Sequence, residues 1–131
     1  MGDSFFGGDA QIPGFETENK RRHLRYRLGG RGKLSFGDPP REIGVQLLDV
    51  SQGGMSVLSD NAFGLGARAR LAVSILCGER AIGAAPAVEV RYCVLDNEYF
   101  RLGLQFLEPD AQTQQAIDTI VEARKTVSRG F

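Results

Sequence analysis

The run Phe100-Arg101-Leu102-Gly103-Leu104-Gln105-Phe106 decides the fold class of this chain. Its apolar side chains fall on every second residue, with polar or small residues between them. Such alternation predicts a strand that buries one face and exposes the other to water, which is typical of an antiparallel sheet.

Upstream runs repeat this alternation and are separated by turn-forming residues. Six strands in an open sheet would leave two unpaired edges, so we expect an all-β fold in which a small antiparallel barrel closes on itself. In the fifth run one face should carry the apolar side chains of Val88, Val90, Tyr92 and Val94. The strands are expected at residues 32–36, 43–50, 55–58, 70–75, 88–94 and 100–106.

A helical pattern follows the last strand, with Pro109 expected at the first helical position. Packing on the barrel is its expected role, and an interface with a partner is the alternative. Arg124 should lie at the margin of the apolar stripe. The stripe repeats at spacings of three and four residues and consists of Ala116, Ile117, Ile120, Val121, Ala123 and Val127.

The 131 residues are enough for one compact domain with its own core. The net charge is zero, but the charges are segregated. Residues 1–19 contain four acids and no base, whereas residues 20–33 contain seven bases and no acid. We therefore expect a flexible acidic, glycine-rich arm at 1–19, the barrel domain at 20–107, and a C-terminal helix and tail at 108–131. Phe5, Phe6 and Phe15 leave open whether the arm docks on the domain.

The two cysteines, Cys77 and Cys93, lack the close spacing of a metal or redox pair, which favours reduced thiols in a cytoplasmic protein. No basic leader precedes a long apolar run, so neither secretion nor membrane spanning is expected. The single histidine, His23, has no acidic or nucleophilic partner at a catalytic spacing. Glu89 beside Arg91 suits a polar sheet face. We expect no enzyme activity and no metal site.

Two short segments carry the chemistry: Arg21-Arg22-His23-Leu24-Arg25 and Asp49-Val50-Ser51-Gln52-Gly53-Gly54. An arginine fork can hold the O6/N7 edge of guanine or phosphate oxygens. An ionised aspartate accepts hydrogen bonds from the opposite edge of guanine, and the Ser51 hydroxyl can bond a base or a phosphate. Gly53 and Gly54 permit positive φ and let the backbone approach the ligand closely, which a Cβ would obstruct.

Each segment alone is common, but both together, in this order and in a chain that also predicts a barrel and a helix, are specific. The pair resembles the RxxxR and DxSxxG motifs of the PilZ family, the bacterial receptor domains for cyclic di-GMP. Val90-Arg91-Tyr92 and Gly103-Leu104-Gln105-Phe106 are similar to the late strands of that family.

The resemblance covers about residues 20–107 and implies cyclic di-GMP as ligand, with no cofactor. It implies that the ligand is bound by Arg21, Arg25, Asp49, Ser51 and Gly54. Further candidate contacts are Lys20, Arg22, Gly53 and Arg91, and a basic residue at position 20 resembles members that take a stacked pair of ligands. The implied role is signal transduction to an effector protein, in motility or biofilm regulation. The segregated charges and the flexible arm further predict that the signal is passed on by ordering of the N-terminal arm.

Two other functions stay open. One is a PilZ-like adaptor that binds proteins without nucleotide. The other is a small-barrel RNA-binding protein, although such sites usually carry several exposed stacking aromatics, and Tyr26 is the sole aromatic of the basic segment. No nucleic-acid polymer is expected as partner.

Overall fold

The computed structural model describes residues 24–129, and the side chains of residues 24–125. The predictions for the arm and for Lys20, Arg21 and Arg22 therefore lie outside the described residues. The elements are β1 (Tyr26–Arg27), β2 (Arg31–Phe36), β3 (Arg41–Val50), β4 (Gly54–Ser59), β5 (Arg68–Cys77), β6 (Arg80–Ala84), β7 (Ala87–Asp96), β8 (Tyr99–Phe106) and α2 (Ala111–Arg129).

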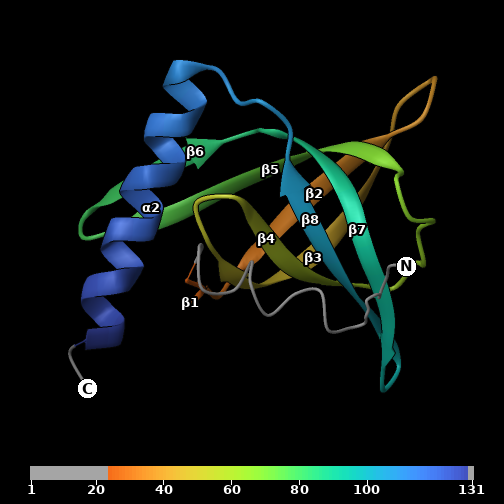
Figure 1. Ribbon diagram of the computed structural model, residues 1–131, viewed down its shortest axis with the longest axis horizontal. Helices are drawn as coiled ribbons and strands as arrows, with labels where there is room; N and C mark the ends of the chain where they lie inside the picture. Colours follow the sequence, from red (N-terminus) through yellow and green to blue (C-terminus); the bar gives the residue numbers. More distant parts are fainter. Residues whose placement is uncertain (1–23, 130–131) are drawn as a thin grey trace.

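Six strands close into an antiparallel barrel (Figure 1). The order is β3-β2-β5-β7-β8-β4, and β4 pairs with β3 to complete the ring. The predicted closed barrel with a terminal helix is confirmed. Two further strands were not predicted, namely β1, which pairs with β3, and β6, which pairs with β5.

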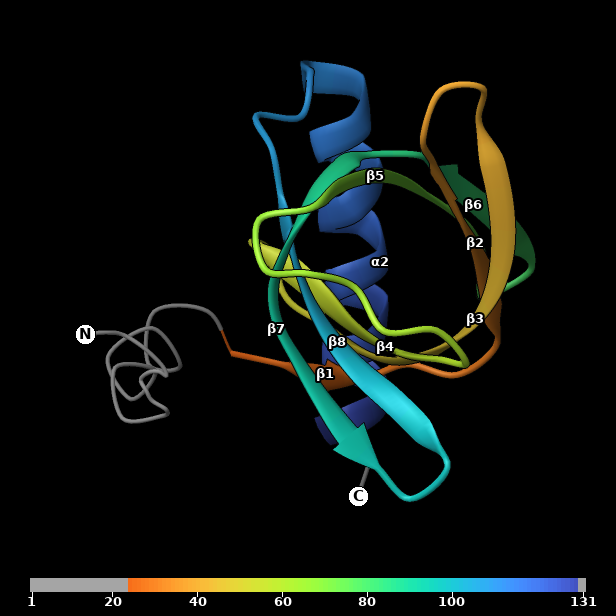
Figure 2. The ribbon, with the colours of Figure 1, turned by 90° about the vertical axis from the view of Figure 1, so that its right-hand side faces the viewer.

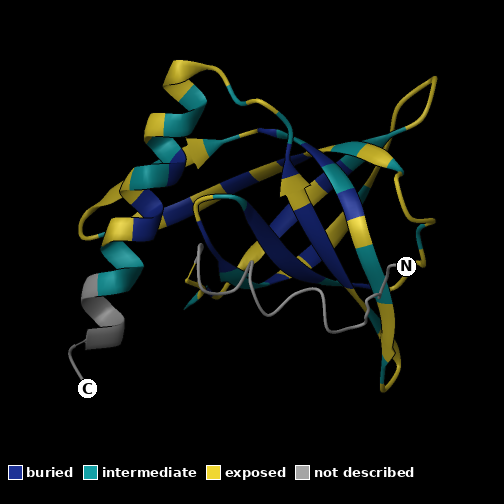
Figure 3. Cartoon of the chain, in the orientation of Figure 1, coloured by how far each residue is buried: buried dark blue, intermediate teal, exposed yellow. Residues whose placement is uncertain are grey.

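The core lies inside this ring, where the buried side chains of the barrel strands gather (Figure 3). On β5, Leu71, Val73 and Ile75 are buried, while Ala72 and Ser74 are exposed, as the alternation predicted. The core residues with almost no exposed surface include Leu34, Val45, Leu47, Val50, Met55, Val57, Leu71, Val88, Val90 and Leu102.

Helix α2 covers one end of the barrel; Figure 2 looks into the ring of strands with the helix behind it. Ile117, Ile120 and Val121 are buried in the same apolar cluster as the strand side chains. The centre of the predicted stripe therefore packs in the core, while Ala116 and Ala123 at its sides are half-buried. Arg124 lies beside the stripe and donates from Nη2 to the Leu76 carbonyl at 3.2 Å.

The helix begins at Ala111, two residues later than a proline at the first helical position would require. Asp110 is the capping residue, because its Oδ1 accepts from the Thr113 N–H at 2.8 Å and its carbonyl accepts from the Gln114 N–H. The expectation that Pro109 occupies the first helical position was wrong. The hydrogen bond from the Thr113 backbone lowers the pKa of Asp110.

Candidate functional site

A β-bulge turns Asp49 to the outside of the barrel. Along β3, Leu47 pairs with Val57 and Asp49 pairs with Ser56, so Leu48 is an extra residue on this strand. The extra residue shifts the alternation by one position. As a result Leu47 and Val50 are both buried, and the Asp49 carboxylate lies on the outer face between them.

The register of the sheet then aligns five residues in one row across β1, β3, β4, β8 and β7. Arg27 is opposite Asp49, Asp49 is opposite Ser56, Ser56 is opposite Gly103, and Gly103 is opposite Tyr92. Directly opposed residues share a face of the sheet, so this row forms one continuous strip of the barrel exterior.

Arg25 lies over this row. Its Nη1 donates to Asp49 Oδ1 at 2.8 Å and to Ser56 Oγ at 3.2 Å. The Ser56 and Tyr92 hydroxyls are hydrogen-bonded, 3.1 Å apart. Gly103 makes this possible, because a Cβ there would overlap the Tyr92 ring. The four polar groups therefore form one chain of contacts from β7 to the start of the described chain.

The contact between Arg25 and Asp49 is open to solvent: the two side chains are 41% and 25% exposed. An ion pair with this exposure contributes only about 0–1 kcal/mol to stability. Arg25 and Asp49 can therefore exchange each other for a ligand at a small cost in stability.

The turn after Asp49 is held by its own groups. The Ser51 hydroxyl is buried, accepts from the N–H groups of Gly53 and Gly54 at 3.3 and 3.2 Å, and donates to the Gly54 carbonyl at 3.3 Å. The Ser51 N–H donates to the same carbonyl at 2.9 Å. In this structure Ser51 therefore shapes the turn.

The glycines of this turn do not use the positive φ that they permit. Neither Gly53 nor Gly54 is among the described residues with positive φ. Gly54 is required for another reason: it begins β4, and a Cβ there would overlap the carbonyl oxygen of Leu104 on β8. The glycine lets the turn lie close against the sheet.

Arg91 is the extra residue of a second bulge, since Val90 pairs with Leu104 and Tyr92 with Gly103. Its Nη1 donates to Gln105 Oε1 at 2.8 Å, and Gln105 is opposite Gly54. Only β8 therefore lies between Arg91 on β7 and the Gly53–Gly54 turn at the start of β4. The bulge also shifts the alternation of β7, so Val94 is 53% exposed and the predicted apolar face ends at Val90.

The PilZ domain family matches residues 19–123 of the chain. This protein belongs to the PilZ domain family. The match spans the whole barrel and most of α2, and it includes the positions of both predicted motifs.

Solved structures with the same fold include a PilZ domain. The PilZ domain of YcgR from Escherichia coli, solved with c-di-GMP, has a TM-score of 0.63 and 17% identity over 85% of this chain and 95% of its own. MotI/DgrA, the inhibitor of motility of Bacillus subtilis, has a TM-score of 0.65 and 24% identity over 81% of this chain and 52% of its own. The MrkH–c-di-GMP complex of K. pneumonia has a TM-score of 0.65 and 16% identity, with coverages of 83% and 54%.

At these identities the similarity shows the fold alone. This PilZ domain spans about half the length of MotI/DgrA and MrkH. No curated protein matches the chain by sequence.

Sequence reasoning missed Ser56, Tyr92 and Gly103 as neighbours of Arg25 and Asp49 on this strip. The available signal was the small residue at 103 in an otherwise bulky strand, which indicates close approach of another group. Only the strand register could show that this group is the Tyr92 ring and that Ser56 lies between Tyr92 and Arg25.

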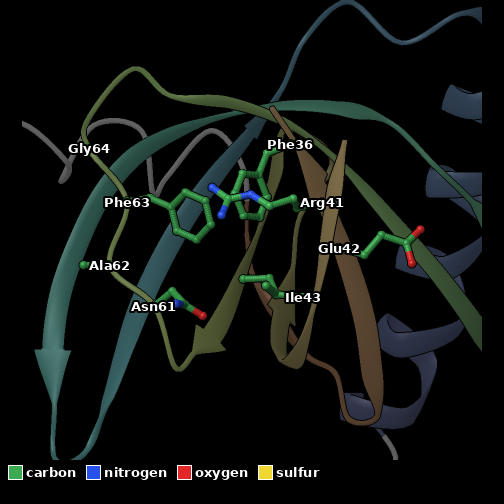
Figure 4. Close-up of a pocket in the computed structure, with 8 residues that line it drawn as sticks. All are labelled: Phe36, Arg41, Glu42, Ile43, Asn61, Ala62, Phe63 and Gly64. Carbon is green, nitrogen blue, oxygen red and sulfur yellow. The ribbon is translucent and has the colours of Figure 1, made fainter. Parts of the chain in front are cut away.

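The hollows of the surface lie away from this strip. A cavity of about 420 Å³ lies under the loop after β4, where the Phe36 and Phe63 rings meet edge to face at 5.1 Å and Arg41 lies over Phe36 (Figure 4). It is at the opposite end of β3 from Asp49, roughly 25 Å along the strand at 3.3 Å per residue. A second hollow of about 480 Å³ lies between α2 and the β5–β6 hairpin. The strip with Arg25 and Asp49 is an open face.

Within residues 24–125, no group of three or more His, Cys, Asp or Glu side chains is arranged to hold a metal ion, and Cys77 and Cys93 are both free. In the part of the chain that the structure describes, no helix combines the length and the apolar character that crossing a bilayer requires.

Proposed function

We propose that this PilZ domain is a non-enzymatic receptor for cyclic di-GMP. The proposal is supported by one observation above all: Arg25, from the first motif, and Asp49, from the second, meet at 2.8 Å on an exposed strip of the barrel. A planar donor and a carboxylate acceptor side by side suit a guanine, which offers acceptors on one edge and donors on the other.

The arginines bind the acceptors of the ligand. Arg21 and Arg25 clamp a guanine O6/N7 edge and a phosphate, and Asp49 accepts from the N1 and N2 donors of a guanine. Binding exchanges the pair between Arg25 and Asp49 for bonds to the ligand. Hydrogen bonds to charged groups contribute about 1.5–3 kcal/mol each, and micromolar affinity needs about 8 kcal/mol net, so a few such bonds are sufficient.

The turn holds the receptor face in shape. Ser51 and Gly54 contribute to the site by fixing the turn that follows Asp49. Lys20, Arg22, Gly53 and Arg91 provide additional contacts, and Arg91 is supported in this role by its position beside Gln105, opposite Gly54.

Titration calorimetry with cyclic di-GMP tests the receptor. The wild-type chain should bind, and Asp49→Ala and Arg21→Ala should each weaken binding about tenfold or more, because each leaves charged or polar ligand groups unpaired. Asp60→Ala, which removes another exposed acid, should leave the affinity unchanged. Absence of binding by the wild-type chain would favour the nucleotide-independent adaptor. Salt-dependent retention of random RNA without response to cyclic di-GMP would favour the RNA-binding function.

In the cell, the receptor acts in the cytoplasm and relays the signal to an effector protein. Its N-terminal arm carries the signal: once Arg21 and Arg25 hold the ligand, the chain on both sides of them loses freedom and presents a different surface. Hydrogen exchange of residues 1–33 should slow when ligand is bound. Exchange that is the same with and without ligand would contradict the relay.

A further inference from the structure

Strand β7 extends beyond its neighbour on one side. On that side β5 pairs only with the first residues of β7, from Ala87 to Glu89. The next residue, Val90, forms backbone hydrogen bonds with Gly66 and Ala67. On the other side β8 pairs with β7 as far as Asp96. Among the described residues, the edge from residue 91 to residue 96, called here the β7 edge, has no backbone partner. Figure 1 shows the β7–β8 hairpin extending past the barrel.

Exposed apolar side chains gather at this edge. Of the six exposed large hydrophobic residues in the described part of the chain, Val94 and Leu95 lie on this edge. Two more are near it: Leu65 in the loop before β5, and Tyr99, which pairs with Asp96 from β8. Leu65 adjoins Gly66, whose N–H bonds to the Val90 carbonyl. Proteins usually protect such an edge with lysine, proline or a covering loop, and residues 91–96 contain neither lysine nor proline.

We propose that the β7 edge is a homodimerisation surface, on which a second copy of this chain pairs antiparallel to form a continuous sheet through two barrels. The charges of the edge select this occupant. Arg91 stands at one end, 3.5 Å from Glu89, and Asp96 stands at the other, 3.3 Å from Arg101. Both are exposed surface pairs of small stability, so their partners can be exchanged. Antiparallel self-pairing brings each arginine toward the partner's aspartate, twice across the two-fold axis. A parallel pairing would bring like charges together.

The edge is six residues long, so the interface is smaller than the 1,200 Å² or so that stable complexes usually bury. The dimer is therefore expected to be weak, with a dissociation constant in the micromolar range or above, and to depend on concentration. The dimer can be tested in the absence of nucleotide.

Sedimentation velocity over a concentration series of the full chain tests the proposal. The wild-type chain should shift from monomer to dimer as concentration rises, and Leu95→Lys should weaken the dimer at least tenfold. Leu76→Lys is the matched control: Leu76 is 64% exposed, as against 65% for Leu95, and lies at the end of β5 away from the β7 edge. A monomeric wild-type chain at near-millimolar concentration, or equal effects of the two lysines, would overturn the proposal.

A charge exchange tests the antiparallel arrangement. Arg91→Asp and Asp96→Arg should each weaken the dimer, and the double variant should recover most of the loss. A double variant no better than the single ones would overturn the arrangement. Slow hydrogen exchange of the edge amides at Cys93 and Leu95 in a purely monomeric sample would show that the chain itself covers the edge, which would also overturn it.

Discussion

Gly54 shows how a glycine of the binding motif serves the fold. Because a side chain there would overlap the Leu104 carbonyl, Gly54→Ala must separate β4 from β8. We expect a loss of about 1–3 kcal/mol in the free energy of unfolding, measured by urea denaturation. Gly64→Ala is the control, since a Cβ at Gly64 meets nothing within 4 Å. Equal stability of the two variants would contradict this role.

Ser56 is expected to position Arg25 for binding. Its hydroxyl accepts from the guanidinium and bonds to the Tyr92 hydroxyl, and it is 1% exposed. Ser56→Ala should weaken cyclic di-GMP binding on the order of tenfold, since a hydrogen bond to a charged group contributes about 1.5 kcal/mol or more. The measurement is calorimetric titration, with the exposed Ser74→Ala as control. An unchanged affinity would show that Arg25 reaches the ligand without this support.

The motifs could be located from residue types and order, but the contacts within them could not. Arginine and aspartate indicated the chemistry that guanine requires, and their order matched a family. Which acceptor Arg25 would find depended on the bulge at Leu48, because without it Asp49 would point into the barrel. A bulge adds one residue with no distinctive composition, so no pattern in the sequence marks it.

At the level of elements, the strongly alternating strands were predictable and the weak ones were not. β5 and β8 alternate apolar and polar residues along their length, and both were predicted. β6 reads Arg-Ala-Ile-Gly-Ala with one β-branched residue, and β1 has two residues, so neither carries a strand signal. Each is a strand because it pairs with a longer strand, β1 with β3 and β6 with β5.

The start of α2 leads to a prediction on pH. The Thr113 N–H bonds the Asp110 carboxylate and lowers its pKa from the ordinary value of 3.8. The folded state therefore binds this proton less readily than the unfolded state. The stabilisation is present above the ordinary pKa and is lost as pH falls through the lowered one.

Asp110→Ala should accordingly lower the thermal unfolding midpoint at pH 7, and the difference from the wild-type chain should shrink below pH 4. Calorimetric scans at pH 7 and at a pH below 4 provide the measurement. Asp60→Ala, which removes a different acid, is the control. A difference that is the same at both pH values would contradict the capping role of the carboxylate.

At the scale of the whole molecule, one core joins the barrel and the helix, and the proposed functions lie on its exterior. The strip with Arg25 and Asp49 crosses β1, β3, β4, β8 and β7, and the β7 edge borders that strip at Tyr92. The barrel and the helix were predictable because they follow from periodicity. The adjacency of the strip and the β7 edge was not, because it depends on where β5 stops pairing with β7.

The central claim is that cyclic di-GMP binds the outer strip between Arg25 and the turn after Asp49. Titration of a ¹⁵N-labelled full chain with cyclic di-GMP, followed by amide chemical shifts, tests it most directly. The account predicts the largest changes at Arg25, at residues 49–54 and at Ser56, with small changes at Phe36 and Phe63 in the cavity at the other end of β3. An unchanged spectrum, or changes concentrated at that cavity, would contradict it.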